Sequence, residues 1–351
     1  MIARLLVLLP FHLLVPEGER YPVFHYEDRG YRVSEYPPGK SDRPTSLEAG
    51  DEVRLDGVRA VEADVLRIEF QKDDFDRREE ALFDPPLDVI QDAIKSFLTR
   101  LRYAARAPQV RPAPVDFPLM TYRIIYLNDD GTELPKAEGL VRVRGGLRFS
   151  FSYIALNGKV WGSIHELPVD FEPTPWEELL LDAQGDLPRI GPAVVLAATA
   201  LEVFIGRKLD ELASLKSLSP DLWTWITDRG NYLRDPTVEE QYDVLLRCFT
   251  GYSLKSERQL WDSFMNLKSA RNSFVHEGVA RVGGAPVSVD DAKKLVDAAS
   301  NVISKVREWL PEELHWPVFR HQVQIEMFKR LQRETPQPPE SPADKAKPTT
   351  R

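Results

Sequence analysis

One segment of the 351-residue chain combines side chains that could act on a phosphate group. It reads LWDSFMNLKSARNSFVHEG over residues 260–278 and places Arg271 and Asn272 shortly before His276. Imidazole groups accept and donate protons near neutral pH, and a guanidinium is permanently charged and binds phosphate through several N–H groups. These residue types suit acid–base chemistry at His276 beside an anion held by Arg271.

The spacing of apolar residues places this segment on a packed helix. Apolar positions and Arg271 follow one another at intervals of four and three, as on one side of an amphipathic helix. The series is Leu260, Phe264, Leu267, Arg271 and Phe274. A guanidinium buried without a partner costs several kcal/mol, so Arg271 should meet a carboxylate, a subunit interface or a phosphate.

Arg271 and His276 do not share a face of a straight helix. Five residues at about 100° each separate them by about 140°. Either the helix unwinds near Gly278, or groups from two symmetry-related chains meet across a dimer axis. Asn272 and His276 are four residues apart and do share a face, so the Asn272 amide could orient the imidazole.

The same segment resembles HEPN domains, including the Apea-like group. Those domains carry an Arg, often followed by Asn, and a His four to six residues beyond it near a helix end. The resemblance covers residues 188–310 in its helical pattern and is tight only over 260–278. It implies a metal-independent endoribonuclease of toxin or defence type, in which the ribose 2′-hydroxyl attacks the adjacent phosphate. RNA is the implied partner, Arg271 and His276 are catalytic, Asn272 is supporting, and neither cofactor nor metal is needed.

The resemblance also implies a homodimer, because HEPN domains commonly pair and form their cleft at the junction. Spacing alone is weak evidence, since Arg20 and His25 repeat the same interval around Pro22, outside any predicted helix. The alternative is a non-catalytic interaction or dimerisation module. In that reading Arg271 pairs with a buried carboxylate such as Glu202, and His276 only caps a helix C-terminus.

Composition indicates an ordinary globular protein in a reducing compartment. The net charge of -9 is concentrated in residues 1–185, so no region carries the surplus of Lys and Arg that non-specific nucleic-acid binding requires. The single cysteine, Cys248, argues for the cytoplasm. The N-terminal run MIARLLVLLPFHLLVP is interpreted as a buried strand. A signal peptide is the alternative, but Pro10 and His12 interrupt the run, which is also too short to span a membrane.

The N-terminal part mixes strand patterns with one helix pattern. Residues 61–70 alternate as a half-buried strand, and residues 86–106 have helical apolar spacing. A proline-rich connector is expected at 108–118. Hairpins are expected from 121 onwards, with strands at 121–127, 140–144, 147–156 and 159–164 and turns at 128–131, Gly145-Gly146 and Asn157-Gly158.

The remaining chain changes to long helical periods. Helices are predicted near 192–213, 219–229, 237–249, 256–277 and 288–310. The expected fold is α+β, with an α+β domain of unknown role over 1–185 and an all-α HEPN-like bundle over 186–310. A regulatory partner protein is a further candidate partner, and no region of the chain is assigned to it. A helical extension is expected over 311–333, although within 317–333 the run FRHQVQIEMF alternates like a strand and leaves that alternative open. A disordered Pro-rich tail is expected over 334–351.

Other polar clusters suggest structural roles. The acidic run KDDFDRREE at 72–80 is interleaved with basic residues and reads as a solvated face instead of a metal site. His315 and His321 lack companions at zinc-ligand spacing. The WTW segment at 223–225 is expected in the core.

Overall fold

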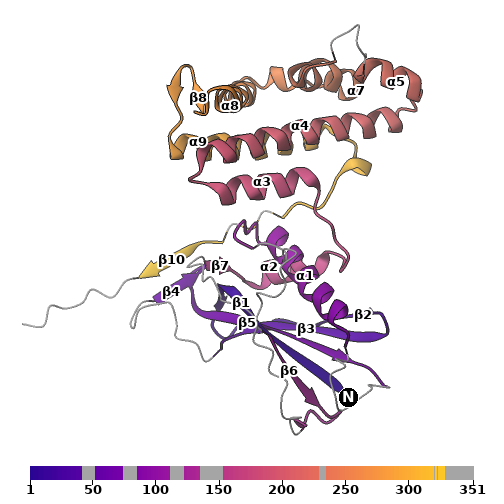
Figure 1. Cartoon of the computed structure of the whole chain (residues 1–351), viewed down its shortest axis with the longest axis vertical. Helices are drawn as coiled ribbons and strands as arrows, with labels where there is room; N and C mark the ends of the chain where they lie inside the picture. Colours follow the sequence, from indigo (N-terminus) through magenta and orange to yellow (C-terminus); the bar gives the residue numbers. More distant parts are fainter. Residues whose placement is uncertain are drawn as a thin grey trace, which may run out of the picture.

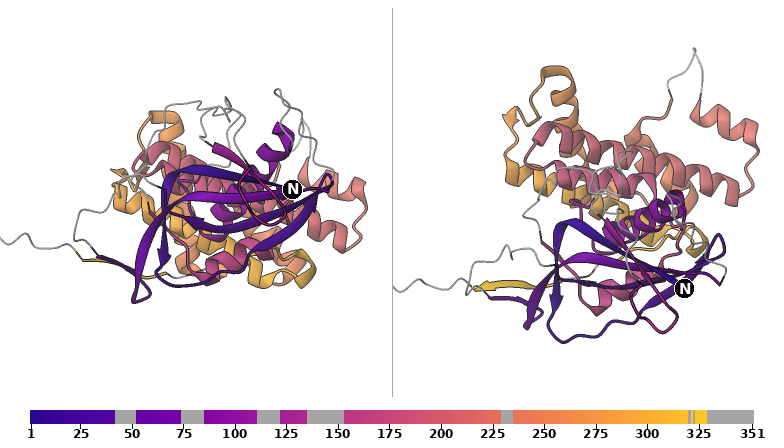
Figure 2. Two further views of the ribbon diagram at one scale, coloured as in Figure 1. Left: turned by 90° about the horizontal axis from the view of Figure 1, so that it is seen from below. Right: turned by 60° about the horizontal axis from the view of Figure 1, so that its bottom comes forward.

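The structure, a computed structural model, describes residues 1–41, 52–73, 85–110, 122–134, 153–228, 235–319, 321 and 323–328. An N-terminal sheet with two helices precedes a C-terminal helical region, so the chain has the predicted α+β class (Figure 1). Figure 2 shows the sheet from below, with the helical region behind it.

The sheet is built around β1 (Ile2–Pro16). This strand lies between β5 (Val58–Gln71) and β6 (Tyr122–Leu127) and is antiparallel to both. The other strands are β2 (Phe24–Asp28), β3 (Tyr31–Gly39), β4 (Glu52–Leu55), β7 (Tyr153–Ala155) and β10 (Ile325–Phe328). Along β1, every second side chain is buried over most of its length, which is the pattern of a strand with one face in the core. The N-terminal strand and the strand at 61–70 are therefore confirmed.

Helix α1 (Leu87–Ala104) covers the sheet on the side facing the helical region (Figure 1). Its apolar side is fully buried against β1, β3 and β5, which confirms the predicted helix at 86–106. The buried side chains include Ile90, Ile94, Phe97, Leu98 and Leu101.

The strand expected at 159–164 is wrong, because these residues form helix α2 (Gly158–Glu166). Asn157 is the N-cap, and its side-chain oxygen accepts a hydrogen bond of 3.0 Å from the backbone N–H of Val160. Asn-Gly suits a hairpin turn, but Asn is equally favoured at a helix N-cap. Trp161 and Ile164 then fall on one helical face and enter the core of the sheet domain.

The hairpins predicted from residue 121 onwards are only partly confirmed. Strand β6 and the turn after it are confirmed, with Gly131 N–H donating to the Asn128 carbonyl at 2.9 Å. Strand β7 lies within the predicted strand at 147–156, but it pairs with β1 in the parallel direction. The expected strand at 140–144, the Gly145-Gly146 turn, most of the connector at 108–118 and the tail at 334–351 lie outside the described residues.

The helical region is organised around α4 (Ile190–Leu215), which packs against α3 (Pro175–Asp186), α8 (Arg258–Glu277) and α9 (Val289–Trp309). Shorter elements complete it: α5 (Pro220–Thr227), α6 (Val238–Glu240), a π-helical turn at Gln241–Leu245, α7 (Leu246–Thr250), and the strand pair β8 (Arg281–Val282) and β9 (Ala285–Pro286). All five predicted helices are thus present, the one at 237–249 in three pieces. Helix α4 is long and apolar enough to cross a membrane, and half of its most apolar window is buried in the core.

Two features of this region differ from expectation. Helix α3 has no counterpart among the predicted helices, although Trp176 and Leu180 belong to the same core as α4. The placement of the whole WTW segment in the core is wrong, because Trp225 is 61% exposed on α5. Only Trp223 reaches the core, where its ring meets the edge of Phe249.

The helical extension expected at 311–333 is also wrong over its described part. A single 3₁₀ turn at Glu312–Leu314 is followed by extended chain and by β10, which pairs with β4. Along this segment Trp316 packs in the helical core, whereas Phe319 and Val323 pack against the sheet domain. The chain first passes from the sheet domain to the helical region between α2 and α3. This later segment returns from the helical region to the sheet, so it connects the two regions a second time.

A buried polar cluster lies between the sheet and its helices. The Arg100 guanidinium of α1 donates to Glu35 of β3 at 2.6 Å, and both side chains are completely buried. The His165 ring of α2 stacks on Phe24, with 4.2 Å between centroids. Burial, together with the positive charge of Arg100, lowers the pKa of His165 to about 3, and burial raises the pKa of Glu35.

His165 should make the fold sensitive to acid. The unfolded chain binds a proton on this histidine near pH 6.5, whereas the folded chain does so only near pH 3, so its contribution is lost as pH falls between these values. The raised pKa of Glu35 acts in the opposite sense, so a variant is needed to separate the two. We expect His165→Gln to flatten the fall of melting temperature between pH 7 and 4. An unchanged slope would show that His165 does not resist protonation.

Candidate functional site

Helix α8 presents the three candidate residues near its C-terminal end. It is regular from Arg258 to Glu277 and ends at Gly278, whose φ of 75° is left-handed. The N–H of Gly278 donates to the Phe274 carbonyl at 2.8 Å, which closes the last turn. The suggestion that the helix unwinds before Gly278 is therefore wrong, and Arg271 and His276 remain about 140° apart around the axis.

The apolar side of α8 is fixed against α4. Phe264, Leu267 and Ala270 are buried, and Leu260 and Phe274 pack at the border of the same core. Near the end of α8, the Phe274 ring lies directly on Gly191 of α4, where a Cβ atom would overlap it. This close approach requires glycine and sets the position of the turn that carries His276.

Arg271 lies half-buried on this apolar side, as the spacing predicts. Its Nη1 donates to the Asn272 side-chain oxygen at 3.1 Å, while its buried Nε–H has no hydrogen-bond partner among the described residues. Among the described residues, no carboxylate lies within 4.0 Å of the guanidinium. Glu202 does not form the direct ion pair considered above, although it and Arg271 line one small cavity of about 20 Å³.

His276 is exposed in the last turn of α8. No hydrogen bond in the described part of the chain involves its ring, and Asn272 directs its oxygen to Arg271 instead of to the imidazole. Val275 and Val279 beside it are 53% and 42% exposed. One chain thus brings Arg271 and Asn272 together and leaves His276 on another face, surrounded by exposed apolar side chains.

Sequence reasoning did not find two further charged residues near Arg271. Lys268, three residues earlier on α8, lines the same small cavity and forms a close ion pair with Glu239 of α6. The i, i+3 spacing of Lys268 and Arg271 was a usable signal, because such residues are neighbours on a helix surface. Glu239 had no such signal, because its position depends on how α6 packs.

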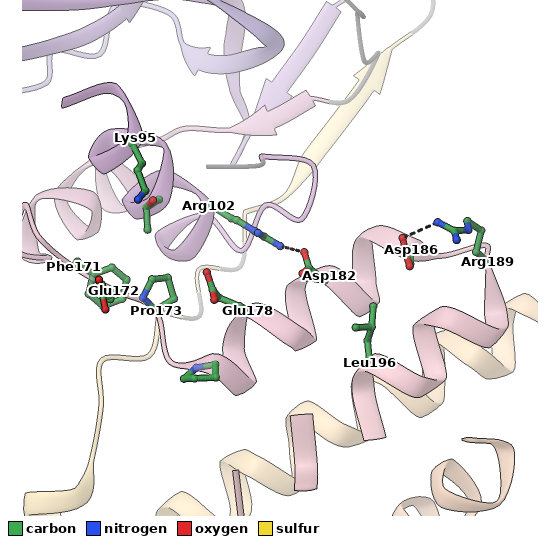
Figure 3. Close-up of a pocket in the computed structure, with 12 residues that line it drawn as sticks. Lys95, Arg102, Phe171, Glu172, Pro173, Glu178, Asp182, Asp186, Arg189 and Leu196 are labelled. Carbon is green, nitrogen blue, oxygen red and sulfur yellow. Dashed lines mark hydrogen bonds and ion pairs between the residues drawn. The ribbon is translucent and has the colours of Figure 1, made fainter. Parts of the chain in front are cut away.

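A larger cleft, of about 820 Å³, lies between the two regions of the chain (Figure 3). Its lining includes Lys95 and Arg102 of α1 and Glu178 and Asp182 of α3, and Arg102 donates to Asp182 at 2.5 Å. Among the described residues, no histidine or cysteine lines this cleft, and Arg271 and His276 lie elsewhere. It therefore offers no imidazole or thiol for acid–base chemistry.

The described ranges contain no group of three or more His, Cys, Asp or Glu side chains in an arrangement that could hold a metal. His315 contacts the Leu310 carbonyl, and His321 contacts the Ser163 hydroxyl. Of the acidic residues in the run at 72–80, only Asp73 is described.

Comparison with known proteins does not identify the chain. No family model matches the sequence, and neither the curated proteins nor the solved structures contain a match. The function is therefore inferred from the side chains of α8 and their surroundings.

The contact between Phe274 and Gly191 can be tested by enlarging the glycine. Gly191→Ala should lower the free energy of unfolding by about 1–3 kcal/mol, because the added methyl group must displace the Phe274 ring. Phe274→Leu in the same chain should restore part of this loss.

Gly206 provides the matched control in the same helix. A Cβ atom there would meet nothing within 4 Å, so Gly206→Ala should raise stability by up to about 1 kcal/mol. Equal effects of the two substitutions in chemical denaturation would contradict the close packing of α8 on α4.

Proposed function

We propose that this protein is a metal-independent endoribonuclease of HEPN type, acting in toxicity or defence. The observation that carries the proposal is the half-buried Arg271 guanidinium, which has no carboxylate partner in the described structure and lies just over one helical turn before the exposed His276. Structural arginines on an apolar seam are normally paired. An arginine without a carboxylate partner, on the same helix end as an exposed imidazole, supports a site for an anion that undergoes proton transfer once the two groups are brought together.

In the proposed reaction the ribose 2′-hydroxyl attacks the adjacent phosphorus atom. A neutral His276 imidazole accepts the hydroxyl proton, the bond from phosphorus to the 5′-oxygen breaks, and a protonated imidazole returns a proton to that oxygen. The products are a 2′,3′-cyclic phosphate and a 5′-hydroxyl. Arg271 binds the non-bridging oxygens, whose negative charge grows in the transition state.

A two-fold dimer would bring these groups together. A dimer repeats each group across its axis, so Arg271 of one chain can approach His276 of the other. Val275 and Val279, exposed beside His276, would be covered by such an interface. This apolar exposure also favours the second candidate function, a non-catalytic HEPN-like dimerisation module.

RNA cleavage should depend on both residues and not on metal. With purified protein, total RNA and excess chelator, we expect wild type to cleave. His276→Ala should reduce the rate about 10²–10⁴-fold, and Arg271→Ala about 10²–10³-fold.

Asn266→Ala is the matched control, since Asn266 is exposed on the same helix and lies outside the proposed site. It should cleave like wild type, and circular dichroism should show the same helix content in all variants. Intact RNA after incubation with wild type would reject the ribonuclease proposal and leave the dimerisation module.

The dimer should depend on the exposed apolar residues beside His276. Light scattering at micromolar concentration should give about twice the chain mass of 40.1 kDa for wild type. Val275→Asp should give a monomer of unchanged melting temperature, because a charge in the interface would lose its hydration.

Leu222→Asp on α5 is the corresponding control, because Leu222 is similarly exposed, at 46%, on a helix outside the proposed interface. It should remain dimeric. A wild-type monomer that still cleaves RNA would rule out a cleft shared between two chains.

A further inference from the structure

Arg271 lines a small cavity between α4, α6 and α8. Its volume is about 20 Å³, and its charged lining residues are Glu202, Lys268 and Arg271. A cavity of roughly 10–15 Å³ on this measure already holds one water molecule, provided that two or more polar groups can bond to it. Both conditions, space and polar partners, are met here.

Of the three charged residues that line the cavity, only Lys268 has an ion-pair partner among the described residues. Lys268 is bound to Glu239 in a close ion pair. Arg271 and Glu202 remain, and each lacks an ion-pair partner within 4.0 Å among the described residues, although both line the cavity. The Arg271 Nε–H is buried without an acceptor, which costs about 1–3 kcal/mol unless a bridging group satisfies it.

The buried tyrosine near Glu202 does not use this carboxylate as its hydrogen-bond acceptor. Tyr242, completely buried, donates its hydroxyl proton to the Leu201 carbonyl at 2.9 Å and not to Glu202. Burial raises the pKa of Tyr242, and the negative charge of Glu202 raises it further. The Glu202 carboxylate therefore remains available to accept a hydrogen bond from the cavity.

We propose that one water molecule in this cavity bridges the Glu202 carboxylate and the Nε–H of Arg271, which makes Glu202 a positioning residue for the guanidinium. The bridge fixes one edge of the guanidinium, and Asn272 fixes Nη1. Nη2, which has no partner in the described structure, is left to an anionic ligand. The role of Glu202 in cleavage rests on the proposed ribonuclease function, but the bridge itself does not.

A water bridge differs from a direct ion pair in its effect on a ligand. A carboxylate in direct contact would occupy two N–H groups of the guanidinium and offset most of its charge. A carboxylate held one water molecule away orients the guanidinium and leaves more of its charge for a phosphate. The spacing of α4 and α8 therefore matters for the site, because it leaves room for a water molecule between Glu202 and Arg271.

The bridge can be observed without any enzymatic assay. In the full chain labelled with ¹⁵N-arginine, the Nε–Hε signal of Arg271 is assigned from its loss in Arg271→Lys. We expect this signal to exchange slowly with solvent and to show a cross-relaxation peak to bound water. Glu202→Leu, which removes the acceptor but keeps the volume, should abolish the water peak and shift the signal.

Glu239→Gln is the control for this measurement, because the Glu239 carboxylate forms its ion pair with Lys268 and not with Arg271. It should leave the Arg271 signal and its water peak in place. A signal that Glu202→Leu does not change, or a wild-type signal without a water peak, would overturn the bridge.

Cleavage kinetics then test the positioning role. If wild type cleaves RNA, Glu202→Leu should lower kcat by on the order of 10- to 100-fold with a smaller change in KM, since a displaced guanidinium loses alignment more than binding. Glu202→Gln, which can still accept from the water, should recover part of kcat.

The two proposals fail in different ways. Wild-type kcat in Glu202→Leu would overturn the positioning role while leaving the ribonuclease proposal intact. A wild type that does not cleave RNA would overturn the ribonuclease proposal, and the Arg271 signal would still decide whether the bridge exists.

Discussion

The guanidinium of Arg271 on the apolar side of α8 is the constraint on which the proposed site depends. This group cannot lose its charge, so every neighbour must accommodate a cation at the border of the core. Asn272 takes one edge, the cavity shared with Glu202 lies on another, and no carboxylate in the described structure pairs with it directly. Phe264 and Leu267, on the same side of α8, lie within the apolar core itself.

The position of α8 depends in turn on the rest of the helical region. Helix α4 supports α8 through Gly191 and Phe274, and α9 packs on both helices. The segment after α9 is held by Lys208, which is almost completely buried, donates to the Leu314 carbonyl at 3.0 Å and lies over the rings of Trp176 and Trp316. The chain then continues to β10 in the sheet, so one continuous segment links the sheet domain to the helices that carry the site.

Local periodicity predicted the elements that depend on their own residues. The N-terminal strand, the strand at 61–70, helix α1 and the long helices α4, α8 and α9 all followed from apolar spacing. The placement of Arg271 on the seam of α8 followed from the same spacing. Two helices without a long periodic pattern, α2 and α3, were not predicted from the sequence. In α3, acidic residues from Glu177 to Asp186 interrupt the spacing of its apolar residues.

Features that depend on distant partners could not be predicted from the sequence. The alternation before Phe328 suits a strand, but only the pairing with β4 decides between strand and helix at 325–328. Asn157 begins a helix because Trp161 and Ile164 find a core there. The gap between Arg271 and Glu202 likewise depends on the packing of three helices. The distance between Arg271 of one chain and His276 of another depends on how two chains pack. The sequence and the structure of a single chain define only the two faces of α8 on which these residues lie.

Complementation between two inactive chains tests the shared cleft most directly. Arg271→Ala and His276→Ala proteins are purified separately, mixed under conditions in which subunits exchange, and incubated with RNA and chelator. A cleft that takes Arg271 from one chain and His276 from the other predicts that the mixture regains a substantial part of wild-type cleavage, although neither variant cleaves alone. A mixture that stays inactive, while wild type cleaves and mass spectrometry shows mixed dimers, would contradict a site shared in this way.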